Sequence, residues 1–105
     1  MAVALVAADR EVWSGKALVV NASTVDGEIG ILANHTPVLS VLAAGQVEIQ
    51  SEDDKTIVVA IDGGFVSVAN NEVRLLCENA EISLSGSYSE AKRKLDERLG
   101  ASGGA

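Results

Sequence analysis

Residues that stabilise small proteins covalently or through metals are almost absent from this 105-residue chain. It contains one cysteine, Cys77, which excludes an internal disulfide and any metal site built on several cysteines. It also contains one Trp, one Tyr and one Phe, which leaves little aromatic surface on which nucleic-acid bases could stack. The chain must therefore be stabilised by an ordinary hydrophobic core, which its length permits.

Basic side chains are also scarce. Eight Lys and Arg stand against 15 Asp and Glu, a formal net charge of −7, and the acidic excess lies within residues 1–84. Because no basic stripe is available to neutralise phosphates, nucleic acid and anionic lipid are disfavoured as partners. Apolar runs of membrane-spanning length are missing, and the N-terminus lacks the basic flank and cleavage site of a signal peptide. The composition predicts a single soluble domain in a reducing compartment.

Short β-branched and leucine-rich segments fill most of residues 1–84. Turn signals separate these segments, among them Ser14-Gly15 and Ala44-Gly45, and no helical pattern lies between them. This spacing is typical of an antiparallel sandwich or barrel. We therefore predict a mainly β fold, a small antiparallel β-sandwich or barrel, with strands over 3–8, 16–22, 28–32, 45–51, 56–61, 65–69, 73–78 and 80–84.

Hydrophobic periodicity predicts which faces of these strands are buried. Val47 and Ile49 alternate with polar residues, and Cys77 falls on the apolar face of its strand. Residues 57–61 are instead apolar on both faces, which a small open sheet rarely needs. We expect a second sheet or another protein to cover that strand.

The pattern changes to that of a helix after residue 84. Ser87 and Glu90 have the spacing of a capping box, and Gly100 is the expected end. A narrow apolar stripe follows at spacings of three and four residues, formed by Tyr88, Ala91, Leu95 and Leu99. Because so short a helix is marginal alone, this stripe must dock on the sandwich or on a partner.

These patterns divide the chain into three regions. We predict a β-domain over 1–84, a short C-terminal helix over 85–99 and a flexible glycine-rich tail over 100–105. The first region would hold the hydrophobic core and the second would be an appendage to it.

No constellation of residues predicts catalysis. The glycines of 27–30 lack the Lys-Ser/Thr pair of a phosphate loop and the third glycine of a dinucleotide fingerprint. The acidic run 52–54 lacks the spaced ligands of a calcium loop. His35 has no serine or cysteine nucleophile in a recognisable elbow, so it is more simply a structural or contact residue. We predict a non-enzymatic protein that uses no metal and no cofactor.

Residues 27–37 form the most unusual segment, which holds two glycines, the only proline and the only histidine. A segment of such unusual composition is either a sharp turn with special backbone conformations in a β-fold or a docking surface. Its sequence, Gly-Glu-Ile-Gly-Ile-Leu-Ala-Asn-His-Thr-Pro, closely resembles the signature loop of the ε subunit family of F-type ATP synthases. Three further runs, 13–15, 62–66 and 71–76, match features of that family in the same order. The resemblance covers 1–84 and, weakly, 85–99.

The resemblance implies a non-catalytic rotor subunit of the F1 central stalk in a proton-translocating ATP synthase. Its sandwich would bind the γ subunit and rest on the c-ring, which couples ring rotation to ATP synthesis, and α or β subunits are further candidate partners. It also implies a peripheral position on the membrane. The single short helix and the unremarkable N-terminus favour the cytoplasmic face of a bacterial plasma membrane over a thylakoid. The partner-binding residues that it implies are Glu28, Gly30, Ile31, Leu32, His35 and Pro37.

Within this implied site, the residues have different expected roles. Glu28 and His35 would be polar contacts, and the glycines and Pro37 would set the shape of the loop. Ile31 and Leu32 would pack against a partner or, as an alternative, inside the sandwich core.

The chain departs from the family pattern in three places. Ala33 stands where the family usually has proline, which loosens the loop slightly. One helix replaces the usual two that can extend along γ and inhibit ATP hydrolysis, so we expect a shortened regulatory element. Residues 86–91 keep only the alanine of the family's Ile-Asp-x-x-Arg-Ala motif, so ATP binding there is not expected.

The basic residues of the predicted helix, and the whole chain, also have alternative interpretations. Four basic side chains are candidates for contact with an acidic segment of a β subunit, although a solvated helix face is the simpler interpretation. They are Lys92, Arg93, Lys94 and Arg98. For the whole chain, the alternative function is that of a free-standing β-sandwich adaptor or ligand-binding module.

Overall fold

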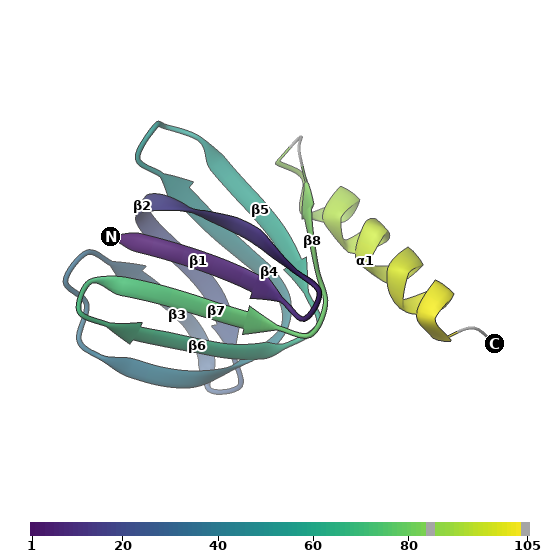
Figure 1. Cartoon of the computed structure of the whole chain (residues 1–105), viewed down its shortest axis with the longest axis horizontal. Coiled ribbons are helices and arrows are strands. Elements are labelled where there is room, and N and C mark those ends of the chain that lie inside the picture. Colours follow the sequence, from purple (N-terminus) through teal and green to yellow (C-terminus); the bar gives the residue numbers. More distant parts are fainter. Residues whose placement is uncertain (84–85, 104–105) are drawn as a thin grey trace.

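A computed structural model describes residues 1–83 and 86–103 of the chain as eight strands followed by one helix (Figure 1). The strands are β1 (Ala2–Ala7), β2 (Arg10–Thr24), β3 (Gly27–Leu32), β4 (Val38–Ser51), β5 (Thr56–Ile61), β6 (Gly64–Ala69), β7 (Glu72–Cys77) and β8 (Ala80–Ser83). The helix, α1, spans Tyr88–Gly103. The predicted mainly β sandwich or barrel with a C-terminal helix is confirmed.

The eight strands form one continuous sheet that folds back on itself. Its order is β3-β2-β1-β7-β6-β4-β5-β8, and an additional pairing of β2 with β4 closes five of the strands into a barrel-like ring. All neighbours are antiparallel except β1 and β7, which run parallel. The sequence did not predict this parallel pair, because the two strands are joined through the rest of the sandwich rather than by a local turn.

The long strands β2 and β4 belong to both layers of the sandwich. The first half of β2 pairs with β1 and its second half pairs with β3 and β4, while β4 pairs with β6 and then with β5. Register shifts between Ala17 and Val19 and between Ala22 and Thr24 allow β2 to bend. Each of these strands therefore passes from one layer into the other.

Two of the predicted turns are wrong, because Ser14-Gly15 lies within β2 and Ala44-Gly45 lies within β4. At Gly15 a Cβ atom would stand 3.0 Å from ring atoms of Trp13, so this glycine makes room for an aromatic ring. Gly45 has a φ of 153° and lies where β4 leaves β6 and begins to pair with β5. A glycine within a strand commonly marks such a close approach or bend.

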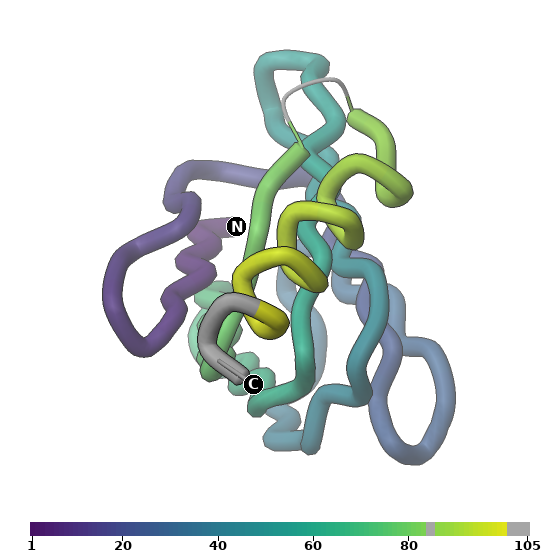
Figure 2. The backbone as a smooth tube through the Cα atoms, turned by 90° about the vertical axis from the view of Figure 1, so that its right-hand side faces the viewer, coloured from purple at the N-terminus to yellow at the C-terminus, as the bar shows by residue number. Residues whose placement is uncertain are grey.

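The core lies between the two layers and has the predicted orientation of side chains. Val47 and Ile49 are fully buried, and Cys77 lies inside while its neighbours on β7 face outward. The apolar strand over 57–61 is covered on its second face by α1, which packs on β5 and β8 (Figure 2). The cover is thus neither a second sheet nor another protein but the chain's own helix.

The apolar stripe of α1 docks on the sandwich. Ala91 and Leu95 are buried against Ala60 of β5, with Tyr88 and Leu99 packed at the sides. The helix begins as predicted, since the hydroxyl of Ser87 accepts the backbone N–H of Glu90 at 3.4 Å. It ends at Gly103, three residues beyond the expected end at Gly100.

Two of the predicted boundaries fall outside the part of the chain that the structure describes. The end of the β-domain at residue 84 and the last two residues of the tail over 100–105 lie there. The division into a β-domain, a helix and a tail therefore stays a prediction.

Candidate partner-binding surface

The unusual segment 27–37 forms β3 and the loop that follows it. Ile31 of β3 pairs with Val20 of β2 and is fully buried, so it belongs to the core. Its neighbour Leu32 points the other way, and 59% of its surface is exposed. The two apolar residues of the predicted site are therefore divided, one stabilising the strand and one facing solvent.

The loop after β3 is held in place by hydrogen bonds of backbone and side-chain groups. Asn34 has a φ of 62° and donates its N–H to the side-chain oxygen of Asn71 in the β6–β7 turn, at 2.8 Å. His35 donates its N–H to the carbonyl of Leu32 at 3.2 Å, and its Nδ1 lies 2.7 Å from the carbonyl oxygen of Thr36. This loop and the β6–β7 turn thus form one end of the sandwich, away from α1 (Figure 1).

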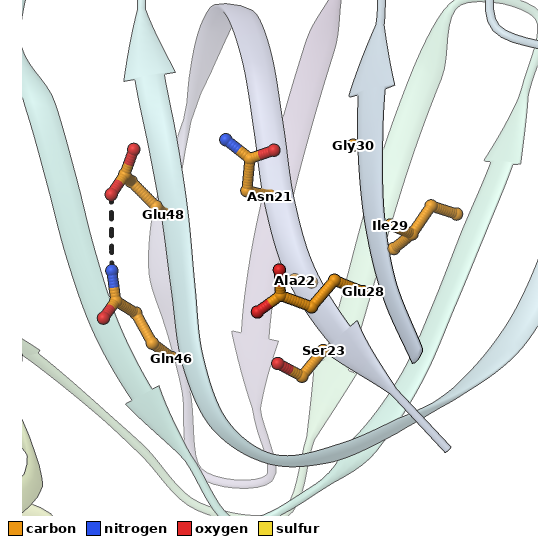
Figure 3. Close-up of a pocket in the computed structure, with 8 residues that line it drawn as sticks. All are labelled: Asn21, Ala22, Ser23, Glu28, Ile29, Gly30, Gln46 and Glu48. Carbon is orange, nitrogen blue, oxygen red and sulfur yellow. Dashed lines mark hydrogen bonds between the residues drawn. The ribbon is translucent and has the colours of Figure 1, made fainter. Parts of the chain in front are cut away.

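Glu28 lies at the other end of β3, beside an open polar cavity of about 410 Å³ (Figure 3). The residues that line the cavity come from β2, β3 and β4, and are Asn21, Ala22, Ser23, Glu28, Ile29, Gly30, Gln46 and Glu48. The amide of Gln46 donates a hydrogen bond to Glu48 at 3.3 Å. The cavity thus presents two carboxylates and several neutral hydrogen-bonding groups.

Gly30 does not have a positive φ, and its open side faces the side chain of Asn21 on β2. A Cβ atom at this position would lie 3.1 Å from the side-chain oxygen of Asn21. The absence of a side chain therefore leaves the wall of the cavity open beside Asn21. This is the structural reason for one of the two glycines that make the segment unusual.

The structure does not gather the predicted site residues into one cluster. Glu28 lies near the start of β3 and His35 lies in the loop beyond its end, a separation of more than about 10 Å at the rise of a β-strand. Leu32 and Pro37 are exposed and His35 is half-buried. The segment is an extended edge of the sandwich, and not a pocket that encloses one ligand.

An apolar surface on the outer face of β4, β6 and β7 was missed by the sequence reasoning. Val41 pairs with Phe65, and Phe65 pairs with Leu76, so the three side chains form a row across the strands. Their exposed fractions are 43%, 54% and 50%, and that of Leu39, two residues before Val41, is 75%. We call these four residues the apolar row.

A signal for the apolar row was present in the sequence. Phe65 and Leu76 occupy outward positions on β6 and β7, and the inward positions of both strands are also apolar. Strands that are apolar on both faces are typical of sheets that are covered on both sides. The strand over 38–44 was not predicted, however, so Leu39 and Val41 could not be placed on a face. A contiguous apolar surface of this kind marks an interaction site.

The basic residues of α1 differ in whether their ion pairs lie within the helix or reach the sandwich. Lys92 pairs with Asp96 at 3.1 Å and Lys94 pairs with Glu90 at 3.4 Å, both within the helix. Arg98 instead reaches back to the sandwich, where it contacts Glu81 and Asp9. The hydrogen bond from Arg98 lowers the pKa of the Asp9 carboxyl and raises that of the guanidinium.

Cys77 has the environment of a structural residue. It is buried at the end of β7, and burial together with the nearby charge of Asp62 raises the pKa of its thiol to about 11. The thiolate is the reactive form of cysteine, so this side chain is a small core residue and not a nucleophile. Among the described residues, no helix is long and apolar enough to cross a membrane.

Comparison with protein families gives one match that covers most of the chain. Residues 1–83 match the family model described as ATP synthase, Delta/Epsilon chain, beta-sandwich domain. The ATP synthase epsilon chain of Streptomyces coelicolor is 50% identical over 95 residues, which cover 90% of this chain and 77% of the relative. The similarity therefore extends beyond the β-domain into the helix.

Two solved structures have a similar fold. A chain of the mitochondrial ATP synthase of Euglena gracilis, in an assembly of OSCP, F1 and c-ring, aligns with a TM-score of 0.73 at 25% identity. The alignment covers 90% of this chain and 61% of the Euglena chain. A chain of the central stalk and c-ring of Tetrahymena thermophila ATP synthase aligns with a TM-score of 0.61 at 18% identity, covering 100% of this chain and 96% of that one, and shows the fold alone.

Proposed function

The chain belongs to the ATP synthase delta/epsilon family, and from this premise we propose that it sits in the central stalk between the γ subunit and the c-ring. Members of this family are non-catalytic subunits, so its role is mechanical and regulatory. The observation that carries the proposal is the 50% identity to an ATP synthase epsilon chain over 95 residues.

The apolar row is the surface that we assign to the γ subunit. It is contiguous, it crosses three strands of a rigid sheet, and its four side chains are between 43% and 75% exposed. Stable interfaces have a desolvated apolar centre, and aromatic side chains are enriched there. Phe65 would be the central residue of this contact, because it pairs with both Val41 and Leu76.

The outer edge formed by β3 and the following loop is the surface that we assign to the c-ring. Glu28, Leu32, His35 and Pro37 are accessible or partly accessible along this edge, whereas Ile31 is buried and would support it from inside. Gly30 would contribute by leaving the cavity beside Glu28 open. Polar and charged contacts of this kind set register and specificity more than affinity.

The location follows from these partners. We infer a peripheral position at the cytoplasmic face of a bacterial plasma membrane, held there by the c-ring and not by insertion. The relatives from Streptomyces support a bacterial source. Contact of Lys92, Arg93 and Lys94 with a β subunit is compatible with α1 as docked, whereas Arg98 contacts the sandwich in this structure.

Capture of this chain by its partners tests the proposal. A purified γ subunit and membrane-embedded c-ring would be mixed with the wild type, with Glu28→Ala/His35→Ala, and with Leu39→Ser/Phe65→Ser. We expect stable capture of the wild type and weaker capture of both variants, because truncating interface centres commonly costs more than ~1 kcal/mol, or roughly five-fold in Kd. Circular dichroism checks that each variant is folded.

A matched control uses another exposed leucine. Leu18 is 49% exposed on β2, near the end of β4 remote from the apolar row, so Leu18→Ser removes an exposed leucine outside that row. We expect its capture to equal that of the wild type. Absence of wild-type capture at micromolar concentration would overturn the proposal. Equal losses in Leu18→Ser and Leu39→Ser/Phe65→Ser would overturn the assignment of the apolar row.

A further inference from the structure

A basic side chain, Arg74 of β7, lies beside the apolar row on the outer face of the sandwich. It is exposed, and Leu76 of the row follows two residues later on the same strand. At the rise of a β-strand these two residues are about 7 Å apart. Across the sheet, Arg74 pairs with Ser67 of β6, which in turn pairs with Leu39 of the row. Arg74 therefore adjoins the apolar row both along its strand and across the sheet.

The guanidinium of Arg74 has no partner in the part of the chain that the structure describes. It forms neither an ion pair nor a side-chain hydrogen bond with residues 1–83 or 86–103, whereas Arg10 and Arg98 are paired with carboxylates. Its neighbours on the adjacent strands are Ala4 of β1 and Ser67 of β6, which carry no charge and have short side chains. The guanidinium thus stands clear of its neighbours and is free to bind a group on another molecule.

The surroundings of Arg74 make a cation exceptional on this face. The chain has a formal net charge of −7, and Glu72, two residues before Arg74 on β7, is exposed on the same side of the strand. Going along β7, the outward side chains are therefore an anion, a cation and a leucine. An acidic group that approaches this face is attracted at Arg74 and repelled at Glu72, so the pattern selects one register of the partner.

A partner that covers the apolar row also covers Arg74. A stable interface removes about 800 Å² per partner from water, which corresponds to a patch roughly 30 Å across. Arg74 is only about 7 Å from Leu76 and falls well within such a patch. A charge that loses its water without gaining a counter-charge is strongly unfavourable. A partner that fits this face must therefore supply an anionic group at Arg74.

We propose that Arg74 binds the carboxylate of an Asp or Glu side chain of the γ subunit and so fixes the orientation of γ on the apolar row. This inference rests on the proposed assignment of the apolar row to γ. A guanidinium can hold a carboxylate through two parallel N–H···O hydrogen bonds, which fix direction as well as distance, whereas a lysine supplies only a point charge. The apolar row provides the desolvated centre of the contact, and Arg74 provides its register.

Binding of the intact chain to purified γ subunit tests this role. The variants are Arg74→Gln, which removes the charge, Arg74→Lys, which keeps it, and the control Lys55→Gln. Lys55 lies in the β4–β5 turn, is 77% exposed, and has its nearest carboxylate 4.0 Å away. We expect the Kd to rise at least about ten-fold in Arg74→Gln, less in Arg74→Lys, and to stay near wild type in Lys55→Gln. Exposed substitutions of this kind change folding stability little, which urea denaturation checks.

Charge exchange identifies the group on γ. Arg74→Glu places two carboxylates against each other, so it should bind more weakly than Arg74→Gln. Each Asp and Glu of γ would then be replaced in turn by Lys, and one of these γ variants should restore the binding of Arg74→Glu while binding the wild type poorly. Raising NaCl from about 0.05 M to about 0.5 M should also weaken binding of the wild type more than binding of Arg74→Gln.

The outcomes separate this inference from the proposed function. Binding of Arg74→Gln equal to that of the wild type, while Leu39→Ser/Phe65→Ser still binds weakly, would overturn the role of Arg74 and leave the apolar row as the γ surface. Equal losses in Arg74→Gln and Lys55→Gln would reveal a general effect of charge and overturn it too. Failure of every γ variant to restore Arg74→Glu would overturn the carboxylate partner. Absence of wild-type binding would overturn the proposed function and this inference together.

Discussion

At the scale of single residues, burial decides which side chains are available for chemistry or contact. Ile31 and His35 were candidates for partner contact, and Cys77 is the one thiol of the chain. The structure places Ile31 and Cys77 in the core and ties the imidazole of His35 to the local backbone. Of the predicted contact residues with a side chain in the signature segment, those that are exposed are Glu28, Leu32 and Pro37, which suit recognition.

The raised pKa of Cys77, about 11, leads to a prediction about reactivity. Burial disfavours the charged thiolate in the folded chain, so at pH 8 only about 0.1% of the Cys77 thiol is ionised. In the unfolded chain, where the pKa is near its ordinary value of about 8.5, roughly a quarter is ionised. We expect alkylation by iodoacetamide at pH 8 to be at least about 100-fold slower in the folded chain than in urea.

Mass spectrometry of timed samples would measure this difference. Reactivity of the folded chain should rise with pH up to about 11, since a raised pKa delays ionisation to higher pH. Fast alkylation at pH 8 under native conditions would contradict the burial of this thiol. An engineered cysteine at exposed Ser14 provides the reactive reference.

At the scale of secondary structure, glycine positions in turns are the most demanding part of the fold. Gly63 lies in the turn between β5 and β6 and Gly64 begins β6, and both have positive φ, 124° and 148°. A Cβ atom at Gly64 would also overlap the carbonyl oxygen of Leu76 on β7. The start of β6 therefore requires a residue without a side chain for two separate reasons.

The substitution Gly64→Ala should destabilise the chain more than Gly27→Ala. Gly27 also has a φ of 124°, but a Cβ atom added there would meet nothing within 4 Å, so only backbone strain of about 1–3 kcal/mol applies. Gly64→Ala adds a backbone clash, and we expect a larger loss of unfolding free energy. Urea denaturation followed by Trp13 fluorescence would compare the two variants, and equal losses would contradict the clash.

Strand bounds were predicted correctly where a turn signal coincides with the end of an apolar pattern. They were wrong where a turn signal falls inside a strand. The strands predicted over 56–61 and 65–69 were placed well, because Gly63 and the pair Asn70-Asn71, which follow them, take positive φ in tight turns. Gly15 and Gly45 carry the same signal for other reasons, an aromatic ring and a bend, so β2 and β4 were cut short. Pattern alone cannot separate a glycine that ends a strand from one that lets it bend.

The candidate site was also predicted only in part, because sequence patterns show local features and not the pairing of distant strands. The segment 27–37 was visible because its composition is unusual, and its resemblance to a known family gave it a role. The apolar row consists of ordinary Leu, Val and Phe residues from three strands, which only register brings together. Register across β4, β6 and β7 depends on tertiary pairing. The sequence therefore shows the outward apolar positions of Phe65 and Leu76 but not their alignment with Val41.

At the scale of the whole molecule, the sandwich should unfold as one cooperative unit. Ile49 is fully buried on β4, which pairs with β2, β5 and β6 and so reaches strands of both layers. We expect Ile49→Ala to lower the unfolding free energy by ~2–5 kcal/mol. Hydrogen exchange should show the same decrease in the free energy of opening for the most protected amides of β1, β5 and β7.

The control for this prediction is Leu95→Ala, whose cavity would lie under α1 instead of between the layers. It should accelerate exchange in the helix and leave the protected sandwich amides close to wild type. A response to Ile49→Ala confined to β4 and its immediate partners would show that the two layers unfold separately.

The passage of β2 and β4 through both layers also has a consequence for mechanics. In a sandwich made of two separate sheets, the layers meet only through side chains, and that boundary is a plane along which one layer can slip over the other. Here hydrogen-bonded backbone crosses the boundary twice, through the bends of β2 and β4. Slippage would require rupture of backbone ladders, so a sideways load applied to one face should reach the opposite face with little internal deformation.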